Sequence, residues 1–439
     1  MSFAADAALG ATPGSVPVRA GGTSAVPRRR YHVRRSALLF IPGMVAGYLW
    51  LSPVFVPPGG AAAAGFSAER IARVLSVALV LPFVIGRLAP LLARQRVLLW
   101  ALLAFVVAPI LTAVNHPDVT FVVGAVGPYM VGGISLLCLA ALRQESFLRW
   151  CQGVGLVATG FVGAGFARYG FDAPSYYGRP RVHLGFVHPT QTASAVLVAG
   201  LYVAYTVFTL ARRSPALRRA LVACTLAALT VLLVVVSSRN TALLLGVILL
   251  GAGYARVLRR PTAKIGLMLL VLALFPAVLL FATQVDPQRP VWVLVNFVSS
   301  YRLEFYSGAL YRLADDDWTS LLIGPTALVR GAATGGFAVV DSVYLSIFFN
   351  YGLITLLAFY AFWIAVIRRV SRQDRPLEYG VLCAVSVYLL LDAQGVTPSN
   401  LLVFVLVART VRAALVAPRR SPRPASRAPG AAAAPRLAV

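Results

Sequence analysis

One arginine, Arg239, stands in a short polar gap between two long apolar runs, in the stretch VVVSSRNTALLLG. No acidic residue lies near it in the sequence. Arginine stays protonated in proteins, and its planar guanidinium donates paired hydrogen bonds to phosphate or carboxylate oxygens. The position therefore predicts a side chain that binds an anionic group at the edge of a membrane.

One carboxylate, Asp341, precedes another apolar run in the stretch DSVYLSIFFNYGL. An ionisable residue at that depth indicates a functional site, and a carboxylate within hydrogen-bond reach can take a proton from a hydroxyl group. Because Asp and Ser are also good helix N-caps, capping is the alternative role, and both roles can hold together. His188 and Glu304 are the next candidates for proton transfer, and Tyr344 is a candidate for substrate contact.

The elements that must position these residues are predicted to be transmembrane helices. Of the 439 residues, 59% are hydrophobic and 12% charged, whereas soluble domains average about 45–50% and about 25%. The mean hydropathy is +0.80. Apolar runs of transmembrane length lie near 37–56, 71–90, 97–115, 121–142, 149–168, 190–211, 218–237, 241–258, 265–283, 343–367, 377–394 and 400–416. The sequence thus predicts an all-α polytopic membrane protein with about twelve spans.

Basic clusters alternate with acid-containing connections along these runs. They occur at 28–35, 94–96, 143–149, 212–219, 256–264, 368–375 and from 409 onward. Cytoplasmic loops carry an excess of Lys and Arg, so both ends of the chain are predicted to be cytoplasmic. The formal charge of +26 is spread over these clusters and not gathered on one domain, which argues against a nucleic-acid-binding protein.

The cations predicted on the outer side are all arginines. They are Arg70, Arg73, Arg168, Arg179, Arg181, Arg239, Arg289, Arg302, Arg312 and Arg330. The side chains of this set can hold a lipid pyrophosphate at the interface. Alternatively, they snorkel or form ion pairs in loops, which is the commoner role for any single member except Arg239.

The sequence divides into a membrane domain and two tails. Residues 36–417 form the predicted membrane domain, and residues 1–35 and 418–439 are predicted to be disordered cytoplasmic tails. The long outer loop 168–188 suits sugar binding or an interfacial aromatic belt. A second long outer loop is predicted at 284–341. Its acidic run at 315–317 is interpreted as a turn before a helix in preference to a divalent-cation site. The four cysteines are predicted to be core residues.

Several stretches together resemble the O-antigen ligase and O-antigen polymerase superfamily. They are HPTQTA after an arginine-containing loop, the SSRNT gap, SYRLEFYSGAL with WTSLLIGP, and DSVYL with YGL, which occur in the family's order between about 180 and 365. The resemblance implies a GT-C-like helical glycosyltransferase in a bacterial cytoplasmic membrane, with its active site facing outward. It also implies an undecaprenyl pyrophosphate-linked glycan as donor, and no metal or cofactor.

The resemblance also implies roles for particular residues. Arg179 or Arg181 matches the family's first pyrophosphate-binding arginine, Arg239 matches the second, and Arg302 matches the arginine that opens a surface helix. Asp341 stands where ligases usually have histidine, which favours a polymerase of repeat units over a ligase. The expected partners are the lipid bilayer, a flippase and a chain-length regulator.

Three other functions compete with this one. A ligase would transfer the glycan to a lipid or protein acceptor. A transporter or flippase often shows two related halves, and residues 37–211 show no similarity to 218–416. A metal-dependent transferase with an acidic pair in its first outer loop is disfavoured, because Glu69 is the single acidic residue of that loop in this sequence.

Overall fold

A computed structural model represents the whole chain. The structure describes residues 38–52, 55, 76, 79–118, 122, 126–171, 175–176, 179–180, 182, 184–186, 189–210, 214–235, 239–258, 260–282, 290, 292–293, 308–309, 313, 316–326, 329, 342–391 and 401–416.

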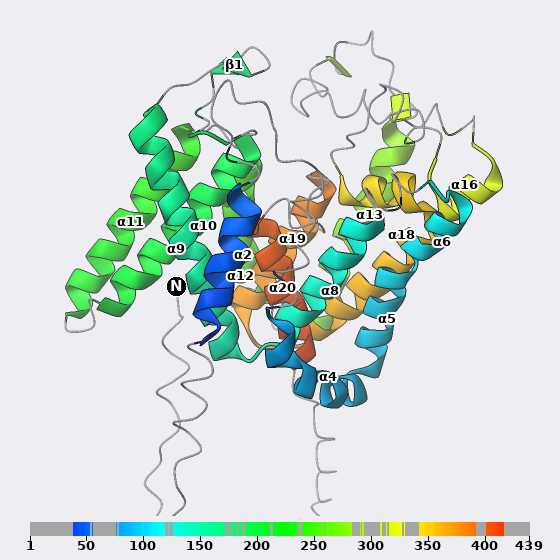
Figure 1. Cartoon of the computed structure of the whole chain (residues 1–439), viewed down its shortest axis with the longest axis horizontal. Coiled ribbons are helices and arrows are strands. Elements are labelled where there is room, and N and C mark those ends of the chain that lie inside the picture. The colour runs from blue at the N-terminus through cyan, green and yellow to red at the C-terminus, as the bar shows by residue number, and fades with distance from the viewer. Residues whose placement is uncertain are drawn as a thin grey trace, which may run out of the picture.

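The described residues are mostly helical (Figure 1). The helices are α2 (Phe40–Leu51), α4 (Leu81–Arg94), α5 (Arg96–Val107), α6 (Pro109–Asn115), α8 (Gly127–Ala141), α9 (Gln144–Tyr169), α10 (Pro189–Leu210), α11 (Pro215–Val235), α12 (Arg239–Val257), α13 (Pro261–Ala282), α16 (Trp318–Ile323), α18 (Val343–Ser371), α19 (Pro376–Leu391) and α20 (Leu401–Val416). The strands β1 (Ser175–Tyr176) and β2 (Arg179–Pro180) pair antiparallel.

Each predicted apolar run contains at least part of a helix. Four helical stretches are long and apolar enough to cross a membrane, namely Arg96–Asn115, Gln144–Tyr169, Gln191–Thr209 and Val343–Ser371. Shorter apolar helices lie in six further runs, and α11 and α20 lie in the runs near 218–237 and 400–416. Many large apolar side chains on these helices are exposed, as expected where lipid replaces water as the solvent. The protein is therefore a helical membrane protein, and the total of twelve spans stays a prediction.

Proline marks where several of these helices begin. Pro189, Pro215, Pro261 and Pro376 are the first residues of α10, α11, α13 and α19. The first turn of a helix has backbone N–H groups without partners, so proline, which lacks an N–H, is tolerated there. These prolines explain why helix starts agree closely with the predicted runs.

Several of the basic connections meet at one end of the helix bundle. Arg87 donates to the carbonyl of Ala141 at 2.8 Å, and Gln373 donates to that of Ala413 at 2.9 Å. Both acceptors lie near the ends of helices, whose last carbonyls lack partners within the helix. The connections α4–α5, α8–α9 and α18–α19 meet near the end of α20, where Gln95 donates to Leu415 O at 3.1 Å and Arg412 donates to Leu142 O. We call this region the basic end.

Two further arginines strengthen the basic end. Arg412 is 8% exposed, donates to Leu142 O at 3.1 Å and also donates to the Gln144 side chain. Arg409 forms a two-pronged ion pair with Glu378, with N–O distances of 2.9 and 3.2 Å. Arg87, Arg409 and Arg412 thus connect neighbouring helices at this end.

The opposite end carries α16 and the β1–β2 hairpin (Figure 1). Helices α5 and α6 run from the basic end, at Arg96, to this other end, at Asn115. At about 1.5 Å per residue, this length is close to the thickness of a bilayer core, about 30 Å. We call the second region the α16 end. The alternation of charge along the sequence matches this separation into two ends.

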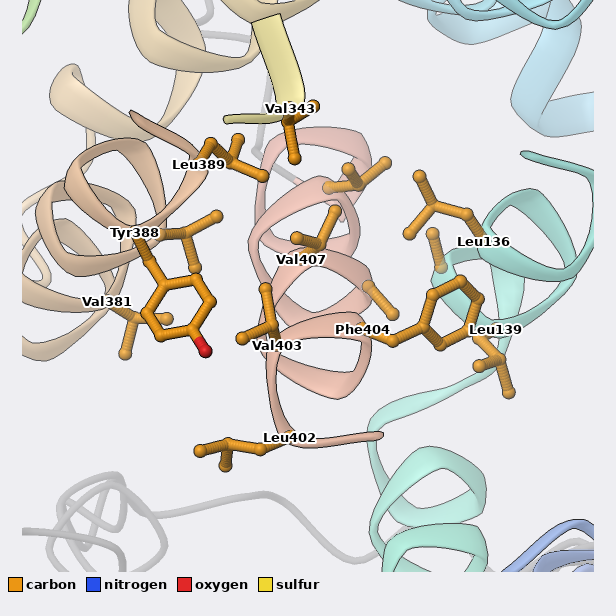
Figure 2. Close-up of a cluster of buried hydrophobic side chains, with 14 of the residues drawn as sticks. Leu136, Leu139, Val343, Val381, Tyr388, Leu389, Leu402, Val403, Phe404 and Val407 are labelled. Carbon is orange, nitrogen blue, oxygen red and sulfur yellow. The ribbon is translucent and has the colours of Figure 1, made fainter. Parts of the chain in front are cut away.

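One part of the core lies where α20 packs between α8 and α19 (Figure 2). Phe404 of α20 reaches toward Leu136 and Leu139 of α8, while Val381 and Tyr388 lie on the α19 side. Aromatic rings extend the core elsewhere, with Phe105 beside Phe359, Phe362 and Tyr129. These helices form the frame on which the α16 end is built.

Glycine allows two pairs of helices to cross closely. A Cβ on Gly251 of α12 would lie 3.0 Å from Cα of Gly380 in α19, and a Cβ on Gly380 would lie 2.3 Å from Ile248 O. In the α2–α9 crossing, a Cβ on Gly153 would lie 2.2 Å from Phe40 O. Membrane helices without a hydrophobic driving force between them depend on such small residues for packing.

Replacing Gly251 by leucine is expected to reduce the yield of folded protein strongly, because the new side chain would collide with α19. The matched control is Gly253→Leu, two residues away on α12, where an added Cβ meets nothing within 4 Å. Folded yield is measured by fluorescence-detected size-exclusion chromatography. Equal yields for the two variants would contradict this crossing.

Cysteine burial follows the prediction only in part. Cys138 and Cys383 are buried and Cys151 is half-buried, but Cys224 is exposed on α11, so the prediction of a core position was wrong for Cys224. The apolar pattern of α11 is continuous around the helix and does not reveal which face meets the protein. All four thiols are free.

Candidate functional site

The predicted site residues fall in three groups. The structure describes Tyr344 with its side chain, and Arg179 and Arg239 by their place in the backbone. The remaining five lie outside the described residues, namely Arg181, His188, Arg302, Glu304 and Asp341. The site is therefore built from the elements that border them.

Arg239 is the first residue of α12. Helix α11 ends at Val235, after which the chain starts a new helix that packs against both α11 and α19. The chain leaves the hairpin β1–β2, descends through α10 to the basic connection and returns through α11. The backbones of Arg239 and of Arg179 in β2 therefore share the α16 end.

Helix α18 begins at Val343, two residues after Asp341 in the sequence. Ser342 occupies its N-cap position without capping through its side chain. Ser342 is 1% exposed, and its Oγ has no hydrogen-bond partner among the residues that the structure describes. A buried hydroxyl without a partner costs free energy, which a bound polar ligand can recover. The Ser342 hydroxyl therefore joins the candidate residues at this end.

Tyr344 is fully buried. Its ring centroid lies 5.4 Å from each of the rings of Phe359 and Tyr360. Such edge-on and tilted aromatic contacts stabilise a fixed ring orientation. Tyr344 thus fixes the start of α18 in the core, and substrate contact through its hydroxyl stays a prediction.

Helix α18 covers the apolar run predicted at 343–367, but it is not one continuous rod. Gly352 interrupts it with φ 77° and ψ 178°. Residues 343–351, which we call the first part of α18, run across the α16 end, whereas the remainder runs along the bundle (Figure 1). Only glycine adopts this backbone conformation readily. The sequence signal was present in the NYGL motif, but its meaning depends on contacts with distant segments.

The acidic run before α16 has a structural role in the part that is described. The Asp317 carboxylate accepts from the backbone N–H of Ser320 at 2.7 Å and caps α16. This agrees with the interpretation as a turn before a helix. Among the described residues, no group of three or more His, Cys, Asp or Glu side chains could hold a metal ion.

No family model, curated protein or solved structure matches this chain. The functional argument therefore stands on its residues and geometry. The α16 end combines the start of α12 at Arg239, the hairpin strand with Arg179, and the buried start of α18 next to Asp341. Guanidinium groups there would suit an anionic substrate group, and a carboxylate would suit proton removal.

Proposed function

We propose that this chain is a GT-C-like membrane glycosyltransferase that polymerises undecaprenyl pyrophosphate-linked oligosaccharide repeat units into a surface polysaccharide. The observation that supports it most is the position of Arg239. This arginine opens an apolar membrane helix at the same end as Arg179 and the start of α18. The α16 end faces outward and the basic end faces the cytoplasm, because cytoplasmic connections carry the excess of Lys and Arg.

The reaction is a single displacement at the anomeric carbon of the donor sugar. A hydroxyl oxygen of the acceptor sugar forms the new bond to this carbon, the bond to the pyrophosphate oxygen breaks, and the lipid pyrophosphate leaves with the electron pair. Asp341 takes the hydroxyl proton, with His188 and Glu304 as the next candidates. Arg239, with Arg179 or Arg181, stabilises the negative charge that develops on the leaving group. Single displacement inverts the configuration.

The residue at position 341 favours a polymerase over a ligase. Ligases of the superfamily that this chain resembles usually have histidine there. Arg302 and Tyr344 would contact the glycan or its pyrophosphate. In this account the flippase supplies lipid-linked repeat units to the outer leaflet, and a chain-length regulator acts on the growing polymer.

The test compares surface polysaccharide from cells that lack the gene and from the same cells complemented with the wild type or with Asp341→Ala. We expect single repeat units without the gene, a polymer ladder with the wild type, and single units again with Asp341→Ala at equal expression. A full-length polymer that stays lipid-linked in the deletion strain would indicate a ligase. Repeat units retained in the cytoplasmic leaflet would indicate a transporter.

A further inference from the structure

The break in α18 leaves backbone carbonyls without their usual helical partners. Thr326 supplies two donors to Phe349 O, through its N–H at 2.9 Å and its Oγ1 at 3.1 Å. The Thr355 hydroxyl donates to Tyr351 O at 3.0 Å. Helix breaks at membrane depth are tolerated only where such groups are satisfied within the protein. The break is therefore stabilised by its own set of hydrogen-bond donors.

The segment after α16 fits directly against this break. A Cβ on Gly324 would lie 2.6 Å from Asn350 O, and a Cβ on Gly352 would lie 2.4 Å from Leu322 O. Both glycines have positive φ, 66° and 77°. The two backbones are thus in direct contact, and neither can rotate without displacing the other.

Helix α6 holds this contact from the other side. The Thr112 hydroxyl donates to Ile323 O at 2.5 Å, and the Asn115 side-chain amide donates to Gly324 O at 2.7 Å. Both acceptors belong to the end of α16 and its C-cap, where carbonyls lack helical partners. Thr112 is completely buried. We call this set of contacts between α6, the end of α16 and the break at Gly352 the junction.

The first part of α18 is fixed at both of its ends. At its start, Val343 lies in the core cluster with α19 and α20 (Figure 2), and at its end the junction holds Phe349 and Asn350. Its nine residues span about 13 Å. A rotation of about 10° at the junction corresponds to about 2 Å at the opposite end over this length, so the junction and the core packing of Val343 together set where that end lies. Ser342 stands at that opposite end as the N-cap residue of α18, and Asp341 precedes it in the sequence.

We propose that Thr112 and Asn115 are positioning residues for the glycosyl transfer. They act through the junction, which together with the core packing of Val343 sets the angle of the first part of α18 and so the place of Ser342, the residue that follows Asp341 in the sequence. This inference rests on the proposed function. A misplacement of about 1 Å between reacting groups can lower a rate about 100-fold, so small changes at the junction reach the chemical step without contact with substrate.

The test uses full-length protein in proteoliposomes supplied with undecaprenyl pyrophosphate-linked repeat units. Thr112→Val and Asn115→Asp each remove one donor with little change of shape. We expect kcat to fall about tenfold or more, while KM for the lipid-linked donor changes less than about twofold, since a misplaced base slows chemistry more than binding. Thr112→Ser, which keeps the hydroxyl, should restore kcat.

The matched control is Thr159→Val on α9. The Thr159 hydroxyl donates within its own helix, to Gly155 O at 2.8 Å. If Thr159→Val lowers kcat as much as Thr112→Val, or if both junction variants keep the wild-type kcat, the proposal is wrong. If Thr112→Val fails to fold, Asn115→Asp, which changes a half-buried residue, tests the proposal in its place.

Hydrogen exchange separates this inference from the proposed function. In the junction variants, amides of residues 343–351 should exchange several-fold faster, while those of 357–371 keep the wild-type rate. A wild type that extends no glycan but shows this exchange pattern would defeat the proposed function and leave the junction's control of the first part of α18 intact. Unchanged exchange at 343–351 would defeat the positioning role itself.

Discussion

Replacing Arg239 by alanine is expected to lower glycan polymerisation by about 100- to 1000-fold, the usual effect of removing one group that stabilises developing negative charge. Arg239 begins α12, so the substitution affects a helix terminus and no helix interior. Arg239→Lys keeps the charge but loses the paired hydrogen bonds. A lost bond of this kind costs about 1.5–3 kcal/mol, so Arg239→Lys should stay at least about tenfold slower than the wild type.

The matched control for Arg239 lies on the same helix. Arg256 stands in the last turn of α12, at the basic end, and Arg256→Ala is expected to keep wild-type activity. Initial rates are measured with lipid-linked repeat units at saturating concentration. Equal losses for Arg239→Ala and Arg256→Ala would mean that α12 needs positive charge in general and that Arg239 has no special role.

Replacing Gly352 by alanine is expected to have the second-largest effect, on folding as well as on activity. The new Cβ would lie 2.4 Å from Leu322 O and 2.5 Å from Ile323 N. A backbone at φ 77° and ψ 178° costs a non-glycine residue about 1–3 kcal/mol, and overpacking adds about 1–3 kcal/mol. The temperature of thermal unfolding in detergent and the rate of polymerisation should both fall.

The control for Gly352 is Gly246→Ala in α12, where an added Cβ meets nothing within 4 Å. Alanine favours helix by about 1 kcal/mol over glycine, so this variant should be at least as stable as the wild type. A Gly352→Ala protein that is as stable and active as the wild type would show that α18 can run straight and would remove the junction.

The positions of the helices could be predicted from the sequence because lipid imposes a simple rule. Backbone groups must be satisfied within each span, so apolar runs of sufficient length become helices. The run predicted at 190–211 became α10 at Pro189–Leu210, and the run at 218–237 became α11 at Pro215–Val235. The alternation of basic clusters indicated two ends for a different reason, because Lys and Arg are enriched in the connections on one side of a membrane.

The break at Gly352 could not be predicted in this way. A single glycine in a helical pattern does not reveal a positive φ. The groups that stabilise the break come from distant parts of the chain, since the Thr112 hydroxyl and its acceptor Ile323 O are 211 residues apart in sequence. Hydrophobic periodicity carries no information on such pairs.

The basic end shows a similar limit. Charge patterning identified Arg409 as part of a cytoplasmic cluster, but its ion pair with Glu378 joins two helices. The same holds for Arg412, whose guanidinium donates to Leu142 O at the end of α8. Counting basic residues indicates which side of the membrane they occupy. It does not indicate which helix terminus each one stabilises.

The sequence predicted which residues belong to the candidate site. The structure adds the helices and strands that carry or border them. Ser342 was not singled out from the sequence except as part of a cap, because its burial depends on the path of α18. For Tyr344, the sequence indicated substrate contact, while the structure shows its ring packed against Phe359 and Tyr360.

The most direct test of the central claim is glycan extension by the purified protein. Proteoliposomes containing the wild type alone receive undecaprenyl pyrophosphate-linked repeat units, with EDTA present, and the products are separated by size. The proposed function predicts a ladder of polymers and release of undecaprenyl pyrophosphate, with Arg239→Ala giving single units only. Single units in every sample, with or without added Mg²⁺, would contradict it.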